Sequence, residues 1–177
     1  LLFFICLFNF SLAIIAQPFA SWTKTALTLN NGVVERIIKL PEDKGQFITT
    51  LYKPAAGEFW YFEKANCDFQ FEINGKIYSG KDNWIFKNIN KYTDAKQGDG
   101  ASVTLLSADK KIELSLQFLL YPGLPVIRKN LVIKNITAQT IKLESVDVEK
   151  FEVVEYWPST YSWIFHDYGR RKAIGSY

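Results

Sequence analysis

The feature that most constrains the fold of this chain is a period-two alternation of apolar and polar residues, interrupted by short turns. In the stretch FQFEINGKIYSG, Phe69, Phe71 and Ile73 fall on one face of an extended segment, because successive side chains of a strand point to opposite faces. Asn74-Gly75 follows, and this dipeptide is typical of a two-residue hairpin turn. The stretch therefore predicts a β-hairpin.

The same pattern recurs along the chain. A hairpin with its turn at Asn30 to Gly32 is predicted for LTLNNGVVERIIKL. Another, with a Ser-Ala-Asp-Lys turn, is predicted for ASVTLLSADKKIELSLQFLLY. A fourth is predicted for PVIRKNLVIKNITAQTIKLESVDVEKFEV, with arms around 131–133 and 141–143 and a polar turn over 135–140. Hairpins at this regular spacing are typical of an antiparallel sandwich.

The predicted fold class is all-β, a large antiparallel β-sandwich of about ten to twelve strands with no substantial helix. No stretch of ten or more residues has helical spacing, and the aromatic content of 16% with no methionine favours strands. The polar segment 88–101, which carries two glycines, is predicted to be a loop. The acidic run over 144–152 is predicted to be a solvated strand face rather than a calcium site, with Arg128 as a candidate partner for one of its acids.

The first 16 residues are almost entirely apolar, and the first charged residue is Lys24. They end in small residues, which is typical of a signal peptide cleaved after Ala16, here lacking its own start. A membrane anchor is the alternative, although the run is shorter than the roughly 20 residues of a spanning helix. We therefore expect a signal peptide at 1–16, a linker at 17–26 and a sandwich at 27–177, in a secreted or periplasmic protein.

Charge and rare residues exclude several function classes. The net charge of +3 is too balanced for a nucleic-acid-binding face. Cys67 would be the lone cysteine after signal cleavage, which predicts a small buried side chain without a disulfide. With only one histidine, the chain lacks the residues for a metal centre, a hydrolase triad or mutarotase chemistry. We therefore predict no catalytic residue, no metal and no cofactor.

The densest group of polar and aromatic residues lies near the end of the sequence, in YWPSTYSWIFHDYGRR. Trp157, Trp163, His166, Asp167 and Arg170 are candidate substrate-binding residues. Aromatic rings stack on the apolar faces of sugars, and planar charged groups hydrogen-bond the hydroxyls. Alternatively, the tryptophans fill a core or a domain interface and the charges around them are solvated.

Two stretches carry a family resemblance. The first is LNNGVVERIIKLPEDKGQFITTLYKPAAGEFW, with the run Asn31 to Arg36 and the strand end Thr49 to Tyr52; the second is YPGLPVIRKNLVIKNITAQTIKLESVDVEKF, from Tyr121 to Phe151. Together they resemble the N-terminal β-supersandwich, galactose-mutarotase-like in fold, of secreted glycoside hydrolases similar to family 36 alpha-galactosidases. The resemblance covers residues 27–177.

The resemblance implies a sandwich followed by a catalytic barrel, which takes about 250 residues and has no room in this chain of 177. The catalytic carboxylates of that family belong to the barrel, so none is assigned here. The expected function is that of a non-catalytic domain that supports the barrel and helps to line its substrate entrance. Expected partners are this barrel, an oligo- or polysaccharide and a second copy of the chain. A free-standing carbohydrate-binding or adhesin-like sandwich is the alternative, and a structural surface domain without a ligand is a third reading.

Overall fold

The computed structural model describes residues 19–56 and 66–151, together with the backbone of 162–165 and 171–174. This part of the chain contains strands and no helix, which confirms the all-β prediction. The strands are β1 (Ala20–Trp22), β2 (Ala26–Asn30), β3 (Val34–Lys39), β4 (Lys44–Gly45), β5 (Ile48–Pro54), β6 (Asp68–Ile73), β7 (Lys76–Ser79), β8 (Trp84–Thr93), β9 (Asp99–Ser107), β10 (Ile112–Leu120), β11 (Ile127–Asn135), β12 (Leu143–Lys150), β13 (Ser162–Phe165) and β14 (Arg171–Ile174).

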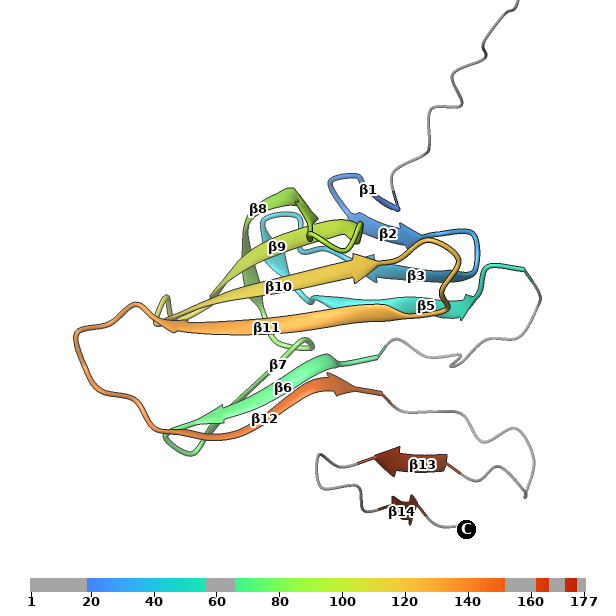
Figure 1. Ribbon diagram of the computed structural model, residues 1–177. Helices are drawn as coiled ribbons and strands as arrows, with labels where there is room; N and C mark the ends of the chain where they lie inside the picture. The colour runs from blue at the N-terminus through green and yellow to red at the C-terminus, as the bar shows by residue number, and fades with distance from the viewer. Residues whose placement is uncertain (1–18, 57–65, 152–161, 166–170, 175–177) are drawn as a thin grey trace, which may run out of the picture.

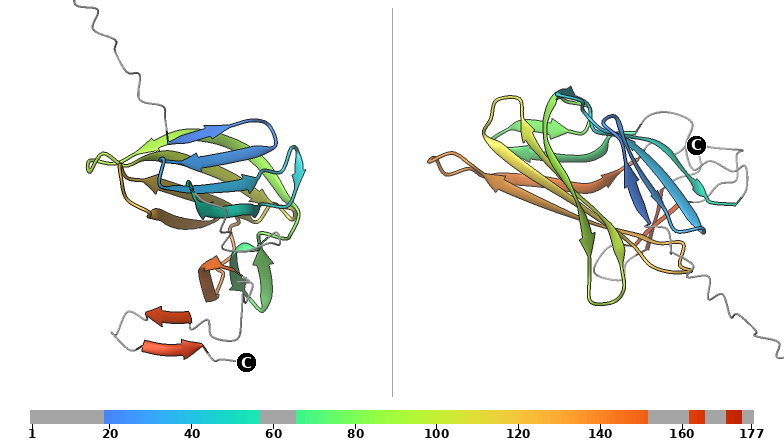
Figure 2. Two further views of the ribbon diagram at one scale, coloured as in Figure 1. Left: turned by 90° about the vertical axis from the view of Figure 1, so that its right-hand side faces the viewer. Right: turned by 90° about the horizontal axis from the view of Figure 1, so that it is seen from above.

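Three antiparallel sheets build the sandwich (Figure 1). A five-stranded sheet has the order β11-β10-β9-β8-β4, and a four-stranded sheet, β1-β2-β3-β5, lies behind it in this view. A three-stranded sheet, β12-β6-β7, lies beneath both (Figures 1 and 2). It contacts both layers, because Asp68 of β6 pairs with Arg36 of β3 and with Lys129 of β11. β13 and β14 pair with each other.

The core forms where the apolar residues of alternating strands meet. Phe69 and Phe71 of β6 are fully buried, and Trp84 at the start of β8 is nearly so. The rings of Phe69 and Trp84 meet edge to face with centroids 5.5 Å apart, and Phe71 stacks on Tyr78 at 5.3 Å. Each such side chain contributes roughly 1.5–3 kcal/mol by its removal from water, so this aromatic cluster ties the three-stranded sheet to the rest.

Three of the predicted hairpins are confirmed. β2 and β3 join through a turn in which Gly32 has a φ of 84°. β6 and β7 join through Asn74 and Gly75, with φ of 51° and 72°, which are the two positive values that a type I′ turn requires. β9 and β10 pair across the predicted Ser-Ala-Asp-Lys turn.

The fourth predicted hairpin is wrong. β11 pairs with β10, and β12 pairs with β6, so the two strands that follow each other in the sequence belong to different sheets. The segment 136–142 therefore crosses between two sheets and does not close a hairpin. The alternation that makes each strand apolar on one face is the same for either pairing, which is why it could not distinguish them.

The loop predicted at 88–101 is also wrong over most of its length. β8 continues to Thr93 and β9 begins at Asp99, leaving a five-residue turn. The segment is polar because much of the distal half of β8 is solvent-exposed. In addition, β1 lies within the predicted linker 17–26 and pairs with β2, so the sheet begins before residue 27.

Two single-residue predictions had different outcomes. Cys67 is buried, as expected, and its thiol donates to the carbonyl oxygen of Phe69 at 3.1 Å. Arg128 forms no ion pair with the described acids of the run, and its guanidinium lies 4.0 Å from Asp94. Among the described residues, Arg36 and Lys129 instead reach Glu149 of the acidic strand, and Lys142 pairs with Glu144.

Candidate ligand-binding cleft

The side chains of the residues predicted to bind substrate lie outside the part of the chain that the structure describes. Trp157, His166, Asp167 and Arg170 lie outside the described residues. Trp163 lies in β13, where its backbone pairs with that of Ala173, and its side chain is outside the description. The sugar subsite predicted at this end of the chain therefore stays a prediction.

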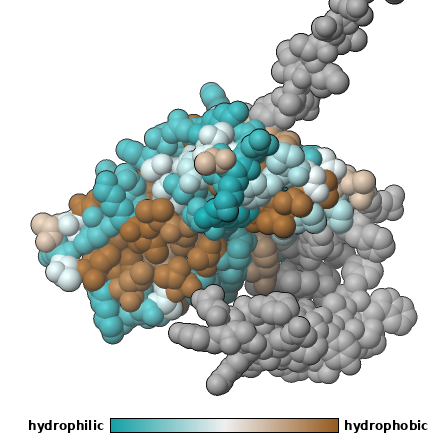
Figure 3. Space-filling view, in the orientation of Figure 1, coloured by the Kyte–Doolittle hydropathy of each residue, from teal (hydrophilic) through white to brown (hydrophobic). Residues whose placement is uncertain are grey.

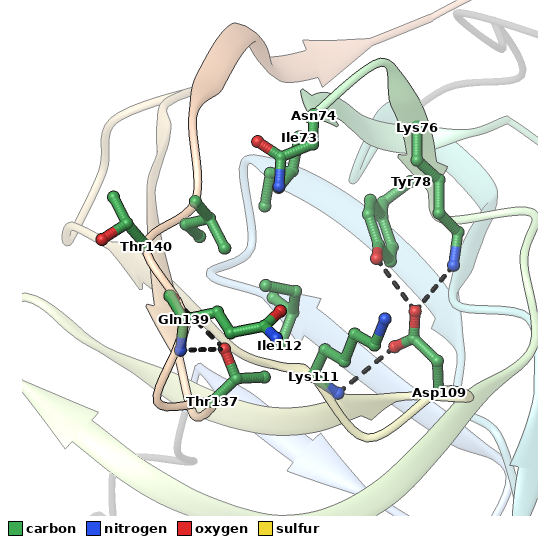
Figure 4. A pocket seen from close by; sticks show the side chains of 11 residues that line it. Ile73, Asn74, Lys76, Tyr78, Asp109, Lys111, Ile112, Thr137, Gln139 and Thr140 are labelled. Atoms are coloured by element: carbon green, nitrogen blue, oxygen red, sulfur yellow. Dashed lines mark hydrogen bonds and ion pairs between the residues drawn. The ribbon is translucent and has the colours of Figure 1, made fainter.

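A cleft of about 250 Å³ lies elsewhere, where three connections meet (Figure 4). The turn between β6 and β7 contributes Asn74, and β7 contributes Lys76 and Tyr78. The turn between β9 and β10 contributes Asp109 and Lys111. The crossing segment between β11 and β12 contributes its residues at 137–141. These connections are more than 25 residues apart in sequence, and the sheet pairings place them side by side.

Asp109 is the anchor of one wall of the cleft. Its Oδ2 accepts hydrogen bonds from Lys76 Nζ at 2.7 Å and from Tyr78 OH at 3.0 Å. Its Oδ1 accepts from Ser107 Oγ at 2.6 Å and from the backbone N–H of Lys111 at 3.2 Å. A carboxylate has about four lone-pair positions, so Asp109 is fully used in holding its neighbours.

These contacts fix the charge states of the wall. Partial burial disfavours the charged form of Asp109, but hydrogen bonds from Lys76, Ser107 and Tyr78 outweigh it and hold the pKa of Asp109 well below its usual value. The hydrogen bond to Asp109 raises the pKa of Lys76. Burial, followed by the hydrogen bond to Asp109, raises the pKa of Tyr78. At neutral pH the wall therefore holds a carboxylate, an ammonium group and a neutral phenol.

Other polar groups that face the cleft have unused hydrogen-bonding capacity. Figure 4 shows the ammonium group of Lys111 pointing into the opening, between the carboxamide of Gln139 and the ring of Tyr78. No described residue accepts a hydrogen bond from this ammonium group. Asn74 Oδ1 accepts from the backbone N–H of Lys142 at 2.8 Å, which leaves Nδ2 on the cleft side (Figure 4). A ligand could therefore satisfy three side chains at once.

The rest of the lining is aliphatic. Ile73 and Ile112 are nearly buried and Ile141 is half-buried, and all three pack against the core. They give the cleft an apolar part beside its polar groups (Figure 4). Small-molecule sites commonly combine an apolar lining with a few placed polar groups.

A second polar cluster lies inside the sandwich, where its three sheets meet. Arg36 of β3 donates from Nε to Thr49 Oγ1 at 3.0 Å, pairs through Nη2 with Asp68, and contacts both carboxylate oxygens of Glu149 at 3.1 Å. Lys129 Nζ lies 2.8 Å from Asp68 Oδ2 and 2.9 Å from Glu149 Oε1. We call Arg36, Asp68, Lys129 and Glu149 the buried ionic network.

The network is electrically balanced, with two cations and two carboxylates. Burial disfavours the charge of Asp68, but Lys129 and Arg36 outweigh it and lower its pKa. Burial likewise disfavours the charge of Arg36, but Asp68 and Glu149 outweigh it and raise its pKa. The ring of Phe118 lies between the two cations, 5.5 Å from the Arg36 guanidinium carbon and 5.6 Å from Lys129 Nζ. Such a network joins the three sheets.

Comparison with known proteins adds no family, since no family model, no curated protein and no solved structure matches this chain. Within the described ranges, no group of three or more His, Cys, Asp or Glu side chains is arranged to hold a metal ion. The same residues include no helix long and apolar enough to cross a membrane.

Proposed function

We propose that this chain is a non-catalytic β-sandwich domain of a secreted carbohydrate-active hydrolase, which packs against the catalytic barrel of that protein. The observation that carries this proposal is an apolar face left exposed between β11 and β12. The resemblance to the sandwich of family 36 alpha-galactosidases indicates that the partner of this face is a catalytic barrel.

The exposed apolar side chains of β12 lie on the same face of the three-stranded sheet as the core residues of β6. In the pairing of β12 with β6, Val146 lies opposite Phe71, and Leu143 lies opposite Ile73, so these side chains point to the same side of the sheet. Phe71 and Ile73 are buried, whereas Leu143 is 49% exposed and Val146 is 40% exposed. The β12 half of this core-facing surface is therefore open to solvent.

Figure 3 shows a continuous apolar area on this side of the molecule, in the region that lies between β11 and β12 in Figure 1. Val148 of β12, at 38% exposure, extends the series of exposed β12 side chains. Among the described strands, β11 and β12 each end the order of their own sheet, so neither outer edge has a described partner strand. A contiguous apolar area is typical of an interaction surface, and a free strand edge favours pairing with another chain.

Self-association of the 177-residue chain tests the proposed packing surface. We expect the chain to form dimers or aggregates in light-scattering chromatography, because this face lacks its partner. The double substitution Val146→Lys and Val148→Lys should shift the chain towards monomer. Val132→Lys is the matched control, since Val132 is 49% exposed but neighbours Ser115 on the other face of the five-stranded sheet.

A monomeric wild-type chain, or equal solubilisation by Val132→Lys, would contradict the proposed surface. The coding sequence that follows Tyr177 tests the parent protein. Several hundred residues of alternating strands and helices, with carboxylates at strand ends, would support the barrel partner. A stop codon directly after Tyr177 would exclude it.

A free-standing carbohydrate-binding sandwich is the second candidate, and the cleft is the observation that favours it. Its polar groups can hydrogen-bond sugar hydroxyls, and its aliphatic residues can contact the C–H groups of a sugar ring. Binding of a sugar at the cleft, with no barrel encoded downstream, would favour this candidate over the first. The two roles use different surfaces and can be tested separately.

A further inference from the structure

The cleft is richer in hydrogen-bond donors than in free acceptors. Asp109 is saturated by four donors, so it cannot accept from a ligand without losing a bond. Donors with capacity left include the Lys111 ammonium and Asn74 Nδ2, while Gln139 contributes an acceptor and a donor from one carboxamide. A ligand that satisfies this set must itself be rich in acceptors.

The charge balance of the cleft favours an anion. Lys76 is paired with Asp109 and lies 4.5 Å from the centre of the Tyr78 ring, so this pair is neutral. Glu144, the acid next to the cleft, accepts from the backbone N–H of Gly75 at 2.6 Å and pairs with Lys142 at 2.9 Å. The exposed Lys111 ammonium therefore has no counter-charge among the described residues, and it is directed into the opening (Figure 4).

Size and shape restrict the anion further. The volume of about 250 Å³ lies just below the roughly 300–1,000 Å³ of drug-sized ligand sites, which favours a single small ring. The aliphatic side formed by Ile73, Ile112 and Ile141 suits the C–H face of such a ring. A simple inorganic anion would leave this apolar side without a contact.

We propose that the cleft binds one acidic sugar unit, a hexuronic acid residue, with its carboxylate on Lys111 and its hydroxyls on Gln139 and Asn74. The aliphatic side packs on the C–H face of the sugar ring. Asp109 is a positioning residue, because it holds Lys76 and Tyr78 in place and does not contact the sugar. This inference rests on the carbohydrate-related function proposed above and gives it a ligand class.

Calorimetric titration of the 177-residue chain with galacturonate tests the inference, with galactose as the neutral counterpart. Galacturonate should bind at least tenfold more tightly, since a charge-assisted hydrogen bond contributes enough for that ratio. Lys111→Met should remove the preference for the acid. Lys110→Met is the matched control: it makes the same charge change one residue away, outside the cleft lining, and should keep the preference.

Four other outcomes of the titration would overturn the acidic-sugar inference. Equal binding of galacturonate and galactose would overturn the acidic-sugar inference and leave the carbohydrate function standing. If acetate binds as tightly as galacturonate, the cleft is a general anion site and the acidic-sugar inference is overturned. Tighter binding of galactose 6-sulfate than of galacturonate would also overturn it, because the preferred anionic group would then be a sulfate and not a carboxylate. Binding of none of these ligands would overturn both the inference and the carbohydrate-binding candidate, but not the packing surface, which light scattering tests independently.

Discussion

The buried ionic network and the cleft are built from the same kinds of side chain and differ in what surrounds them. Both place two basic residues around an aspartate that accepts several hydrogen bonds. In the network, Arg36, Asp68 and Lys129 are at most 3% exposed and every charge has a counter-charge. In the cleft, Lys76 is 57% exposed and Lys111 has no counter-charge among the described residues. The first arrangement stabilises the joint of three sheets, and the second leaves a charge available for a ligand.

The largest effect that this comparison predicts is from Asp68→Asn. We expect the free energy of unfolding to fall by roughly 3–5 kcal/mol, because removing one partner leaves buried charges uncompensated. Asp68 has a φ of 65°, and asparagine tolerates this conformation as well as aspartate does, so backbone strain adds nothing. Urea unfolding measures the change. Asp147→Asn, on the exposed strand β12, is the control and should shift stability by less than about 0.5 kcal/mol.

The pH dependence of stability sharpens the comparison. The pKa of Asp68 is lowered from 3.8 in the folded chain, so the unfolded chain binds its proton first as the pH falls. The stabilisation is therefore complete above about pH 4 and is lost as the pH decreases through the folded pKa. Unfolding of the wild type and of Asp68→Asn at several pH values between 7 and 2 should show two curves that converge in acid. Parallel curves would mean that the network contributes no ionic stabilisation.

The smallest effect is expected from Asp109→Asn. Asparagine can still accept hydrogen bonds from Lys76 or Tyr78, and the side chain of Asp109 is 27% exposed, so solvent compensates part of the loss. We expect the free energy of unfolding to fall by about 1 kcal/mol, measured by urea unfolding. A loss as large as that of Asp68→Asn would erase the distinction between the two clusters.

The local part of the fold was readable from the sequence, and the non-local part was not. Alternation with Asn74-Gly75 specifies the β6–β7 hairpin, because register and turn are set by neighbouring residues. The alternation of β11 and β12 is equally regular, yet the two strands do not pair with each other. β11 pairs with β10, which precedes it, whereas β12 pairs with β6, which is distant in the sequence. The choice between partners depends on which sheet covers which apolar face, and a single sequence does not encode this in any local motif.

The candidate site was missed for the same reason. Lys110 and Lys111 are adjacent in an ordinary polar turn, and only the crossing segment packed beside that turn makes Lys111 line a cleft. The buried ionic network did leave a signal. Arg36 occupies an inward position between Val34 and Ile38, where alternation requires an apolar residue. A charged residue at such a position indicates a buried counter-charge, but the sequence does not say which acid supplies it.

The most direct test of the central claim is a nuclear magnetic resonance titration of the 177-residue chain with galacturonate. Amide signals from the turn 74–76, the turn 109–111 and the segment 137–141 should shift together and saturate at one concentration. Amides around the buried ionic network, at positions 36, 68 and 129, should stay unchanged. Signal shifts confined to other parts of the chain, or no shifts at a high concentration of galacturonate, would contradict the claim that the cleft is a binding site.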